Sequence, residues 1–452
     1  MMLSYYLQLA IRNLRRNVAL TALMVVVVGF GIGASMTVLT TLRAMGADPI
    51  PDKSSQLFVP QIDAWGPPTR PGGGTDASGR LPDQLTYRDA MALMRAHRAV
   101  RQTAMYAVSL DATAADGTTF PVRGRAAYSD FFRMFEVPFR AGRPWTQDDD
   151  NARANVVVLT AKLADRLFLH ANPVGSSINL SDREYRIVGV LGGWNPVPLF
   201  YDLTNGGGLR ANGVGLSDTE DVFLPFSTAI DRQMEINGSY SCNAGTAPGF
   251  EGHLTGECLW LQYWAELPTA AAARDYKAFL YNYSAQQRQL GRFHWTPRVE
   301  LPDLRRWMVL EISVPDTLRV SSAVAFGFLA VCLINTAGLM LARFSVRAGE
   351  LGVRRALGAS RLDIFLQCVV ETAIVGVPGA LVGLGLTAAG PATQRTLHMI
   401  AGSAAAVSRE TALDGDMMLI TLVLAMCAMV CSALYPVWRA SRVQPAWQLK
   451  SQ

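Results

Sequence analysis

The chain has 452 residues, half of them apolar, and a formal net charge of +5 at pH 7. Its mean hydropathy is only mildly positive, so the apolar residues must be concentrated in particular segments. Residues 46–316 contain 26 Lys and Arg against 30 Asp and Glu, whereas the rest of the chain contains 15 against 6. A basic excess confined to the flanks of apolar segments follows the positive-inside rule, and it argues against nucleic acid as a partner.

The first 18 residues have the pattern of an amphipathic helix on the cytoplasmic surface of a membrane. Leu3, Leu7 and Leu14 recur at helical spacing, and Arg15 and Arg16 are placed to meet lipid headgroups. We therefore expect membrane lipids among the partners of residues 1–18.

Four apolar stretches predict transmembrane helices at 19–45, 317–342, 367–390 and 417–437. Each is close to the roughly 20 residues that cross a hydrocarbon core about 30 Å thick. Buried helices of a soluble protein are the alternative, and four stretches of this length argue against it. The first stretch is longer than the core of a signal peptide and has no clear cleavage site, so we expect it to stay attached as an anchor.

The charges between these stretches orient the chain. Arg residues are frequent before the first stretch, in the link 343–366 and in the tail 438–452, whereas the loop 391–416 contains only two. Both termini and the link should therefore be cytoplasmic, with 46–316 and the short loop 391–416 on the other side. This layout predicts a multi-pass protein of the bacterial inner (cytoplasmic) membrane.

The large insertion 46–316 reads as mixed α and β. A strand at 56–62, a helix at 82–97 and a strand at 102–112 are followed much later by a strand at 258–267, a helix at 268–290 with Pro268 in its first turn, and a strand at 298–301. Two such units predict one split βαβ subdomain. Short β-type runs at 120–125, 156–159, 177–180, 185–191 and 221–225 predict a strand-rich inserted subdomain. The Gly-rich stretch 192–217 reads as a long solvated connection, with a functional loop as the alternative.

Two of the six cysteines, Cys242 and Cys258, lie in the insertion, whereas the other four lie in or beside the apolar stretches. A pair of cysteines in an oxidising compartment predicts a disulfide. The alternative is a metal site formed by Cys242, His253 and Cys258, for which three scattered ligands are a weak pattern. We expect the disulfide and no metal site.

Catalytic motifs are missing from this sequence. None of its four lysines follows a glycine, so the Gly-Lys-[Ser/Thr] end of a nucleotide-binding P-loop is absent. The five histidines have no metal-ligand spacing, and there is no G-x-S-x-G motif. We expect a non-catalytic protein that binds no cofactor, with any energy from ATP supplied by another polypeptide.

The link 343–366 predicts a short helix bounded on both sides. Good helix formers run from Glu350 to Leu357, Gly358 is a suitable C-cap, and Ser360 with Asp363 can start the next helix. This helix is either an interfacial helix that binds anionic lipid or a docking surface for a soluble partner, with an apolar centre and a charged rim.

Glu371 is an acid near the start of the third apolar stretch. Acids inside membrane spans are costly and often functional, so a proton relay is one interpretation. We favour a structural ion pair with an arginine of the short helix in the link, because Glu371 lies close to the cytoplasmic end.

Six segments carry a family resemblance. In chain order they are LAIRNLRRN, FFRMFEVPFRAGRPW, NVVVLTAKLADRLF, NPVGSSINLSDREYRIVGVL, GELGVRRALGAS and YPVWRASRVQPAWQL. Together they resemble the FtsX/MacB family of ABC transporter permeases, with a MacB-like periplasmic core domain and an FtsX-like permease domain but no fused ATPase. The tail departs from the family pattern, because 443–449 carries Gln and Trp where acidic and Ala residues are usual.

The resemblance implies a membrane α-helical bundle of four transmembrane helices with a large α+β periplasmic domain. It also implies that the chain dimerises with a second copy or a related permease. A separate ABC ATPase that uses ATP and Mg would be a further partner, and a periplasmic adaptor could be another. In the family the short helix after the second span contacts the ATPase. That assigns ATPase coupling to Glu350, Leu351, Arg354, Arg355, Ala356, Leu357, Gly358 and Ala359.

The function implied is mechanotransmission, in which ATP hydrolysis by the partner moves the periplasmic domains. The cargo would be a periplasmic peptide, a lipid-linked molecule or a lipoprotein. The alternative is an FtsX-like regulator that transmits the state of the ATPase to a periplasmic partner such as a cell-wall hydrolase.

Overall fold

The structure is a computed structural model that describes residues 18–46, 48–66, 80–114, 116–169, 171–196, 198–207, 219–243, 246–311, 316–400 and 415–441. It divides into two compact units, which are described separately. The helical unit comprises 1–45 and 314–452, and the inserted unit comprises 46–313. The predicted amphipathic helix before residue 18 and the tail after 441 lie outside the described residues.

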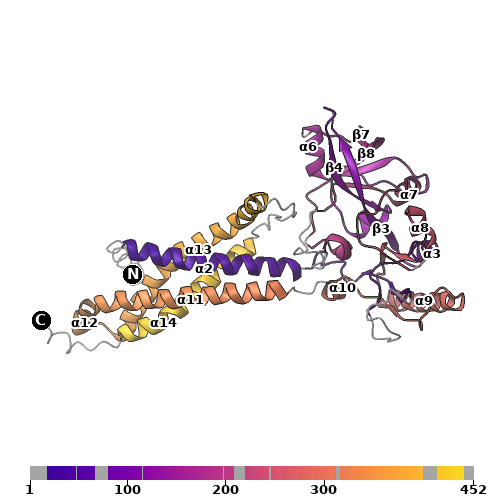
Figure 1. Cartoon of the computed structure of the whole chain (residues 1–452). Helices are drawn as coiled ribbons and strands as arrows, with labels where there is room; N and C mark the ends of the chain where they lie inside the picture. The colour runs from indigo at the N-terminus through magenta and orange to yellow at the C-terminus, as the bar shows by residue number, and fades with distance from the viewer. Residues whose placement is uncertain are drawn as a thin grey trace. The chain divides into compact units, whose positions relative to one another are not determined.

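The helical unit consists of long helices and one short one. They are α2 (Val18–Gly46), α11 (Asp316–Val346), α12 (Ala348–Ala356), α13 (Arg361–Ile400) and α14 (Gly415–Ser441) (Figure 1). Within the described residues, three helices are long and apolar enough to cross a membrane: Val18–Thr40, Val320–Val346 and Arg361–Ala389. The apolar part of α14, Leu422–Trp438, is shorter.

Helix α13 runs to Ile400, past the end that the sequence predicts at 390. The apolar span within it, Arg361–Ala389, ends close to the predicted position. Hydropathy marks where a chain leaves apolar surroundings, whereas a helix continues for as long as its backbone hydrogen bonds do.

Glycines allow α2 and α13 to pack closely. A Cβ atom on Gly383 of α13 would lie 2.8 Å from Ile32 Cγ2 and 3.2 Å from the carbonyl oxygen of Gly29 on α2. A Cβ on Gly29 would lie 2.6 Å from Val382 Cγ1. Small residues four apart on both helices bring the two backbones together, as is common where helices associate within membranes.

Enlarging Gly383 should separate these helices. We expect Gly383→Val to destabilise the helical unit by about 1–3 kcal/mol, because the added atoms have no space between the backbones. Gly385→Val is a matched control, since a Cβ on exposed Gly385 meets nothing within 4 Å. Thermal unfolding of the two full-length variants in detergent tests this, and equal melting temperatures would contradict the packing.

The inserted unit is built on a nine-stranded sheet in the order β1-β12-β3-β4-β9-β6-β8-β5, with β7 pairing with β3 and β8. The strands are β1 (Leu57–Phe58), β3 (Arg101–Thr113), β4 (Thr119–Ala127), β5 (Phe139–Gly142), β6 (Val156–Leu159), β7 (Ser177–Leu180), β8 (Arg183–Leu191), β9 (Val222–Pro225) and β12 (Gln262–Glu266). Two short ribbons pair β10 (Ser241–Cys242) with β11 (Cys258–Leu259), and β13 (Val299–Glu300) with β2 (Gln61–Ile62).

Helices accompany these strands. They are α3 (Tyr87–Ala96), α4 (Asp130–Met134), α5 (Gln147–Asn151), α6 (Ala161–Phe168), α7 (Phe226–Asp231), α8 (Phe250–Thr255), α9 (Ala270–Gln289) and α10 (Leu304–Glu311). Strands β1 and β3, joined through α3, lie on either side of β12. Strand β12 in turn leads through α9 to β13. This is the order of strands and helices that the sequence predicts for the ends of the insertion.

Several predicted boundaries are wrong in detail. The predicted strands at 56–62 and 258–267 are each broken into two short strands. Helix α3 begins at Tyr87 instead of 82, because Thr86 caps it by accepting from the backbone N–H of Asp89. Helix α9 begins after Thr269, whose side chain accepts from the N–H of Ala272, so Pro268 precedes the helix. In both helices a threonine cap sets the start.

The sheet is continuous, because β3 pairs with β4 and β4 pairs with β9. Its residues alternate between two hydrophobic clusters. Tyr106 and Tyr263 belong to one cluster, whereas their neighbours Met105 and Trp264 belong to the other. Since successive side chains of a strand point to opposite faces, both faces of the sheet are covered.

The stretch 192–217 is not simply a solvated connection. Phe200, Tyr201 and Leu203 are buried in one of these clusters, and a 3-10 helix (Phe200–Asp202) and a π-helical turn (Leu203–Gly207) position them. Glycine and asparagine content alone predicts a solvated segment, but burial of its aromatic side chains outweighs the cost of ordering it. Residues 208–217 of this stretch lie outside the described residues.

Candidate functional site

Two caps fix the turn between the short helix α12 and the start of α13. Gly358 has a φ of +103°, and the N–H of Ala359 donates to the carbonyl of Arg354 at 3.1 Å, as in a Schellman cap. Ser360 and Asp363 then cap α13 reciprocally, with Asp363 N–H donating to Ser360 Oγ and Ser360 N–H to the Asp363 carboxylate. The sequence predicts both caps, and both are present.

Apolar side chains are exposed along this link. Val353 is 55% exposed and Leu357 is 83% exposed, and Ala356 and Gly358 are also exposed. The backbones of Leu351 and Arg355 lie within α12, and Ala359 is partly buried. An exposed leucine beside charged groups has the character of an interface centre with a charged rim.

An ion network ties α12 to the ends of two long helices. The carboxylate of Glu371 on α13 lies 3.1 Å from guanidinium nitrogens of both Arg343 and Arg347, and the side chain of Glu371 is only 1% exposed. Arg347 also lies 3.3 Å from Glu350. Arg354 lies 3.5 Å from Glu350 and donates to Gln367 of α13 at 3.0 Å. The network thus connects α11, α12 and α13.

Both oxygens of Glu371 accept from guanidinium groups. This arrangement holds the carboxylate in place between two cations. Its partners come from the end of α11 and the residue just after it, and not from α12 itself. The geometry suits a structural ion pair, which is the role we favour for Glu371.

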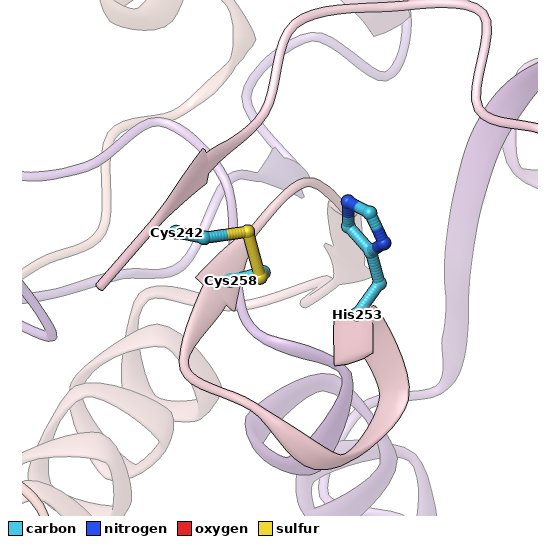
Figure 2. Close-up of side chains that lie close together, drawn as sticks. All are labelled: Cys242, His253 and Cys258. Atoms are coloured by element: carbon cyan, nitrogen blue, oxygen red, sulfur yellow. A yellow bond between two sulfur atoms is a disulfide. The ribbon is translucent and has the colours of Figure 1, made fainter. Parts of the chain in front are cut away.

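The cysteines of the inserted unit lie opposite one another on the β10–β11 ribbon. Cys242 and Cys258 are register partners, their Cα atoms are 4.0 Å apart, and a disulfide joins them (Figure 2). His253 of α8 lies beside them, with the two sulfurs and one ring nitrogen all within 4.8 Å of one another. The disulfide that the sequence predicts and the rival metal site therefore share the two sulfurs.

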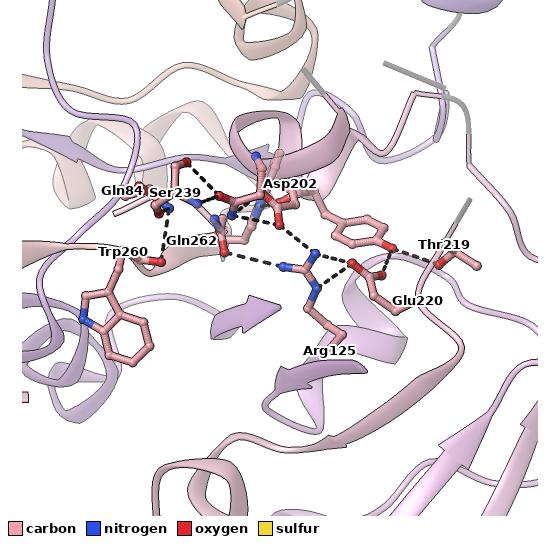
Figure 3. A network of polar contacts seen from close by, with 11 residues as sticks. Gln84, Arg125, Asp202, Thr219, Glu220, Ser239, Trp260 and Gln262 are labelled. Carbon is pink, nitrogen blue, oxygen red and sulfur yellow. Dashed lines mark hydrogen bonds and ion pairs between the residues drawn. The ribbon is translucent and has the colours of Figure 1, made fainter. Parts of the chain in front are cut away.

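A buried polar network joins β4 to the segments around residues 202 and 220 (Figure 3). The guanidinium of Arg125 on β4 lies 2.7 Å from the carboxylate of Asp202 and donates to that of Glu220. Tyr201 donates to the other oxygen of Glu220 at 2.6 Å. Arg125 and Asp202 are each 2% exposed, and burial raises the pKa of Asp202 despite the neighbouring cation. The network fixes the segments around 202 and 220 to the sheet.

Sequence reasoning missed this network. Its only local signal is an arginine among small residues, Gly124, Ala126 and Ala127, inside a strand. Small neighbours leave room for a long side chain, but they do not identify its partners, which lie far along the chain.

Asp150 is a second buried carboxylate in this unit. It accepts from the backbone N–H of Ser129 at 2.8 Å and from Trp145 Nε1 at 2.9 Å. Burial raises its pKa from the ordinary value of 3.8 to about 6. Between these two pKa values the folded state binds more protons than the unfolded state, so the stability contributed by Asp150 is complete below the lower value and is lost as pH rises through about 6.

Replacing Asp150 should therefore flatten the pH profile. We expect the difference in unfolding free energy between wild type and Asp150→Asn to shrink by roughly 2.5 kcal/mol from about pH 4 to pH 7. Asparagine also leaves one donor without its acceptor, which adds an offset that does not vary with pH. Denaturant unfolding of the full chain in detergent, followed by tryptophan fluorescence, measures this difference. If the unfolding free energies of wild type and Asp150→Asn change in parallel with pH, Asp150 does not have the raised pKa that burial gives it here.

Two families match this chain. The family described as the MacB-like periplasmic core domain matches residues 20–250, and the FtsX-like permease C-terminal family matches residues 322–445. Neither matched region is an ATPase domain. The first match alone covers more than half of the chain.

Proteins with similar sequences point to the same family as these two matches. The macrolide export ATP-binding/permease protein MacB of Vibrio parahaemolyticus is 25% identical over 366 residues, which cover 81% of this chain and 47% of that protein. The protein of the same name from Syntrophobacter fumaroxidans is 23% identical, covering 98% of this chain and 63% of that protein. The chain thus spans about half the length of the Vibrio relative.

A solved structure is also similar. The periplasmic region of MacB from Actinobacillus actinomycetemcomitans covers 57% of this chain and 92% of its own, with 14% identity and a TM-score of 0.34. From the two family matches, the chain belongs to the MacB-like and FtsX-like family of ABC transporter permeases, which are bacterial inner-membrane proteins with a periplasmic domain.

Proposed function

We propose that this chain is a non-catalytic permease subunit that couples ATP hydrolysis by a separate ABC ATPase to movement of its periplasmic domain. The observation that carries the proposal is the exposed apolar surface of α12 and the residue after it, which the Glu371 network holds against α11 and α13. A rigidly held surface can transmit a displacement, whereas a loosely tethered one would absorb it.

Chain connectivity gives that displacement a route. Helices α2 and α11 directly precede and follow the inserted unit in the sequence, and the ion network contains Arg343 at the end of α11. A shift of α12 would therefore act on a helix that leads into the inserted unit. In this proposal α14 completes a bundle of four spans, and the bundle dimerises with a second copy or a related permease. Both termini are cytoplasmic.

Four buried hydroxyl groups within the helices favour mechanical transmission over a hydrophilic pathway. The hydroxyls of Ser35, Thr336, Thr372 and Thr387 each donate to a carbonyl four residues earlier in their own helix. Hydroxyls bonded in this way do not offer a polar path for cargo. We propose that the cargo is a periplasmic peptide, a lipid-linked molecule or a lipoprotein, and that it is moved by the periplasmic domains, with or without an adaptor.

The test is to place a charge at the proposed ATPase contact. We expect Leu357→Asp to reduce co-purification of the ATPase by on the order of tenfold or more, because a central apolar contact would become a desolvated carboxylate. Leu290→Asp is the matched control, since Leu290 is also an exposed leucine but lies in the inserted unit. Unchanged complex formation and ATP turnover in Leu357→Asp would reject the coupling assignment.

An FtsX-like regulator of a cell-wall hydrolase would use the same coupling surface. The size of the insertion, residues 46–313, favours the transporter, because FtsX-type outer domains are usually smaller. Crosslinking from the inserted unit in living cells separates the two functions. A captured cargo or adaptor supports transport, and a captured hydrolase supports regulation.

A further inference from the structure

The side chains of Cys242, His253 and Cys258 form a compact group of two sulfurs and one nitrogen. One atom from each lies within 4.8 Å of the others. The ribbon positions the cysteines directly opposite each other, and α8 brings His253 to them. Thiolate sulfur and imidazole nitrogen together are the ligands of many tetrahedral zinc sites.

The imidazole of His253 is held in the tautomer that coordination of a metal through Nε2 requires. Its Nδ1 lies 3.0 Å from the carbonyl oxygen of Gly249. A carbonyl can only accept, so Nδ1 carries the proton and Nε2 keeps its lone pair. Metal-binding histidines commonly fix their tautomer in this way.

The other ring nitrogen is enclosed without a partner. Among the described residues, His253 Nε2 is buried and makes no hydrogen bond. The ring of Tyr240 packs edge-on against the imidazole, with the two ring centroids 4.7 Å apart, and the centroid of the Trp260 ring lies 6.0 Å from that of the imidazole. A buried lone pair without a donor is costly, and a metal ion beside it would remove that cost.

The disulfide decides whether such an ion can bind. In the oxidised form the sulfurs are bonded to each other and neither is a thiolate. A dithiol reductant would transfer two electrons and two protons, which converts the disulfide to two thiols and leaves the reductant as a disulfide. A zinc ion would then displace the two thiol protons, forming two Zn–S bonds and releasing two protons.

We propose that Cys242, Cys258 and His253 form a redox-gated Zn²⁺ site that is closed by the disulfide and opened by its reduction. Three protein ligands leave a fourth position for water or another donor. Bound zinc would replace the disulfide as the link across the β10–β11 ribbon, so the Gly-rich segment between the cysteines would stay closed in either redox state.

The test measures Zn²⁺ binding by the full chain in detergent. Wild type, Cys242→Ser/Cys258→Ser, His253→Gln and His294→Gln are compared, each oxidised and each reduced with a phosphine that is then removed. A chromophoric chelator competes for Zn²⁺, and the visible spectrum with Co²⁺ reports thiolate coordination. The double-serine variant supplies the background from the four cysteines outside the inserted unit.

We expect reduced wild type to bind one Zn²⁺ more than the double-serine variant, and oxidised wild type to bind none above that background. His253→Gln should weaken the affinity by about tenfold or more, while the exposed His294→Gln leaves it unchanged. Thiol titration of oxidised His253→Gln, showing an intact disulfide, confirms that its ribbon is folded. Equal binding by oxidised and reduced wild type, or wild-type affinity in His253→Gln, would overturn the proposal.

Discussion

Replacing Arg125 with methionine should lower the unfolding free energy of the inserted unit by about 3–5 kcal/mol, because removing one partner of a buried ion pair leaves the other charge without compensation. In this network one guanidinium lies between two carboxylates, those of Asp202 and Glu220. The substitution would leave both acids buried without their cation. They could avoid this cost only by taking up protons or by releasing the segments that carry them.

Two comparisons isolate the effect. Arg140→Met makes the same substitution at a surface ion pair with Asp165 and should cost about 1 kcal/mol or less. The triple variant Arg125→Met/Asp202→Asn/Glu220→Gln removes the charges together and should recover much of the stability. Denaturant unfolding of the full chain in detergent measures all three variants. If Arg125→Met and Arg140→Met lose the same stability, the network is not what holds the segments around 202 and 220.

The second large effect is expected in the helical unit. Glu371→Gln should lower its stability by about 3–5 kcal/mol, because Arg343 and Arg347 lose the buried carboxylate that they share. Under the proposed function it should also reduce ATP turnover by the assembled complex, since the end of α11 would lose its ionic link to α13 and, of the contacts described in this network, only Arg354–Gln367 would still tie α12 to α13. Thermal unfolding in detergent and ATPase assays on the purified complex measure the two effects separately.

Glu350→Gln is the matched control for Glu371. The carboxylate of Glu350 is 40% exposed and also pairs with two arginines, so its loss should cost no more than about 1 kcal/mol. Adding Arg343→Met to Glu371→Gln should restore part of the stability by removing one of the two buried cations that have lost the Glu371 carboxylate. A Glu371→Gln variant with wild-type stability would show that the ion network does not hold the link.

The features that sequence predicted well depend on neighbouring residues. The long apolar runs correspond to α2, α11, α13 and α14, and the Gly358 and Ser360 caps bound the link. Both kinds of signal arise within a few turns of chain. The strands at 156–159 and 177–180 were predicted with exact limits for the same reason, since each is a short β-type run between turn residues.

The wrong boundaries have a common cause. Propensity favoured starting α3 at 82 and continuing single strands through 56–62 and 258–267, but side-chain caps and pairing partners set the observed limits. The stretch 192–217 was misread because its glycine content suggested solvent, whereas Phe200 and Tyr201 pack into the core. Local composition cannot reveal a partner that is distant in sequence.

The sequence by itself determined the apolar helices, the position of the large insertion between the first and second of them, and the short capped helix of the link, because hydrophobic length and helix caps are local properties. Only the tertiary structure decided that β12 lies between β1 and β3, that Arg125 meets Asp202 and Glu220, and that Glu371 meets Arg343 and Arg347. These contacts join residues separated by tens to hundreds of positions, and burial away from water makes such pairings strong without leaving a periodic pattern in the chain.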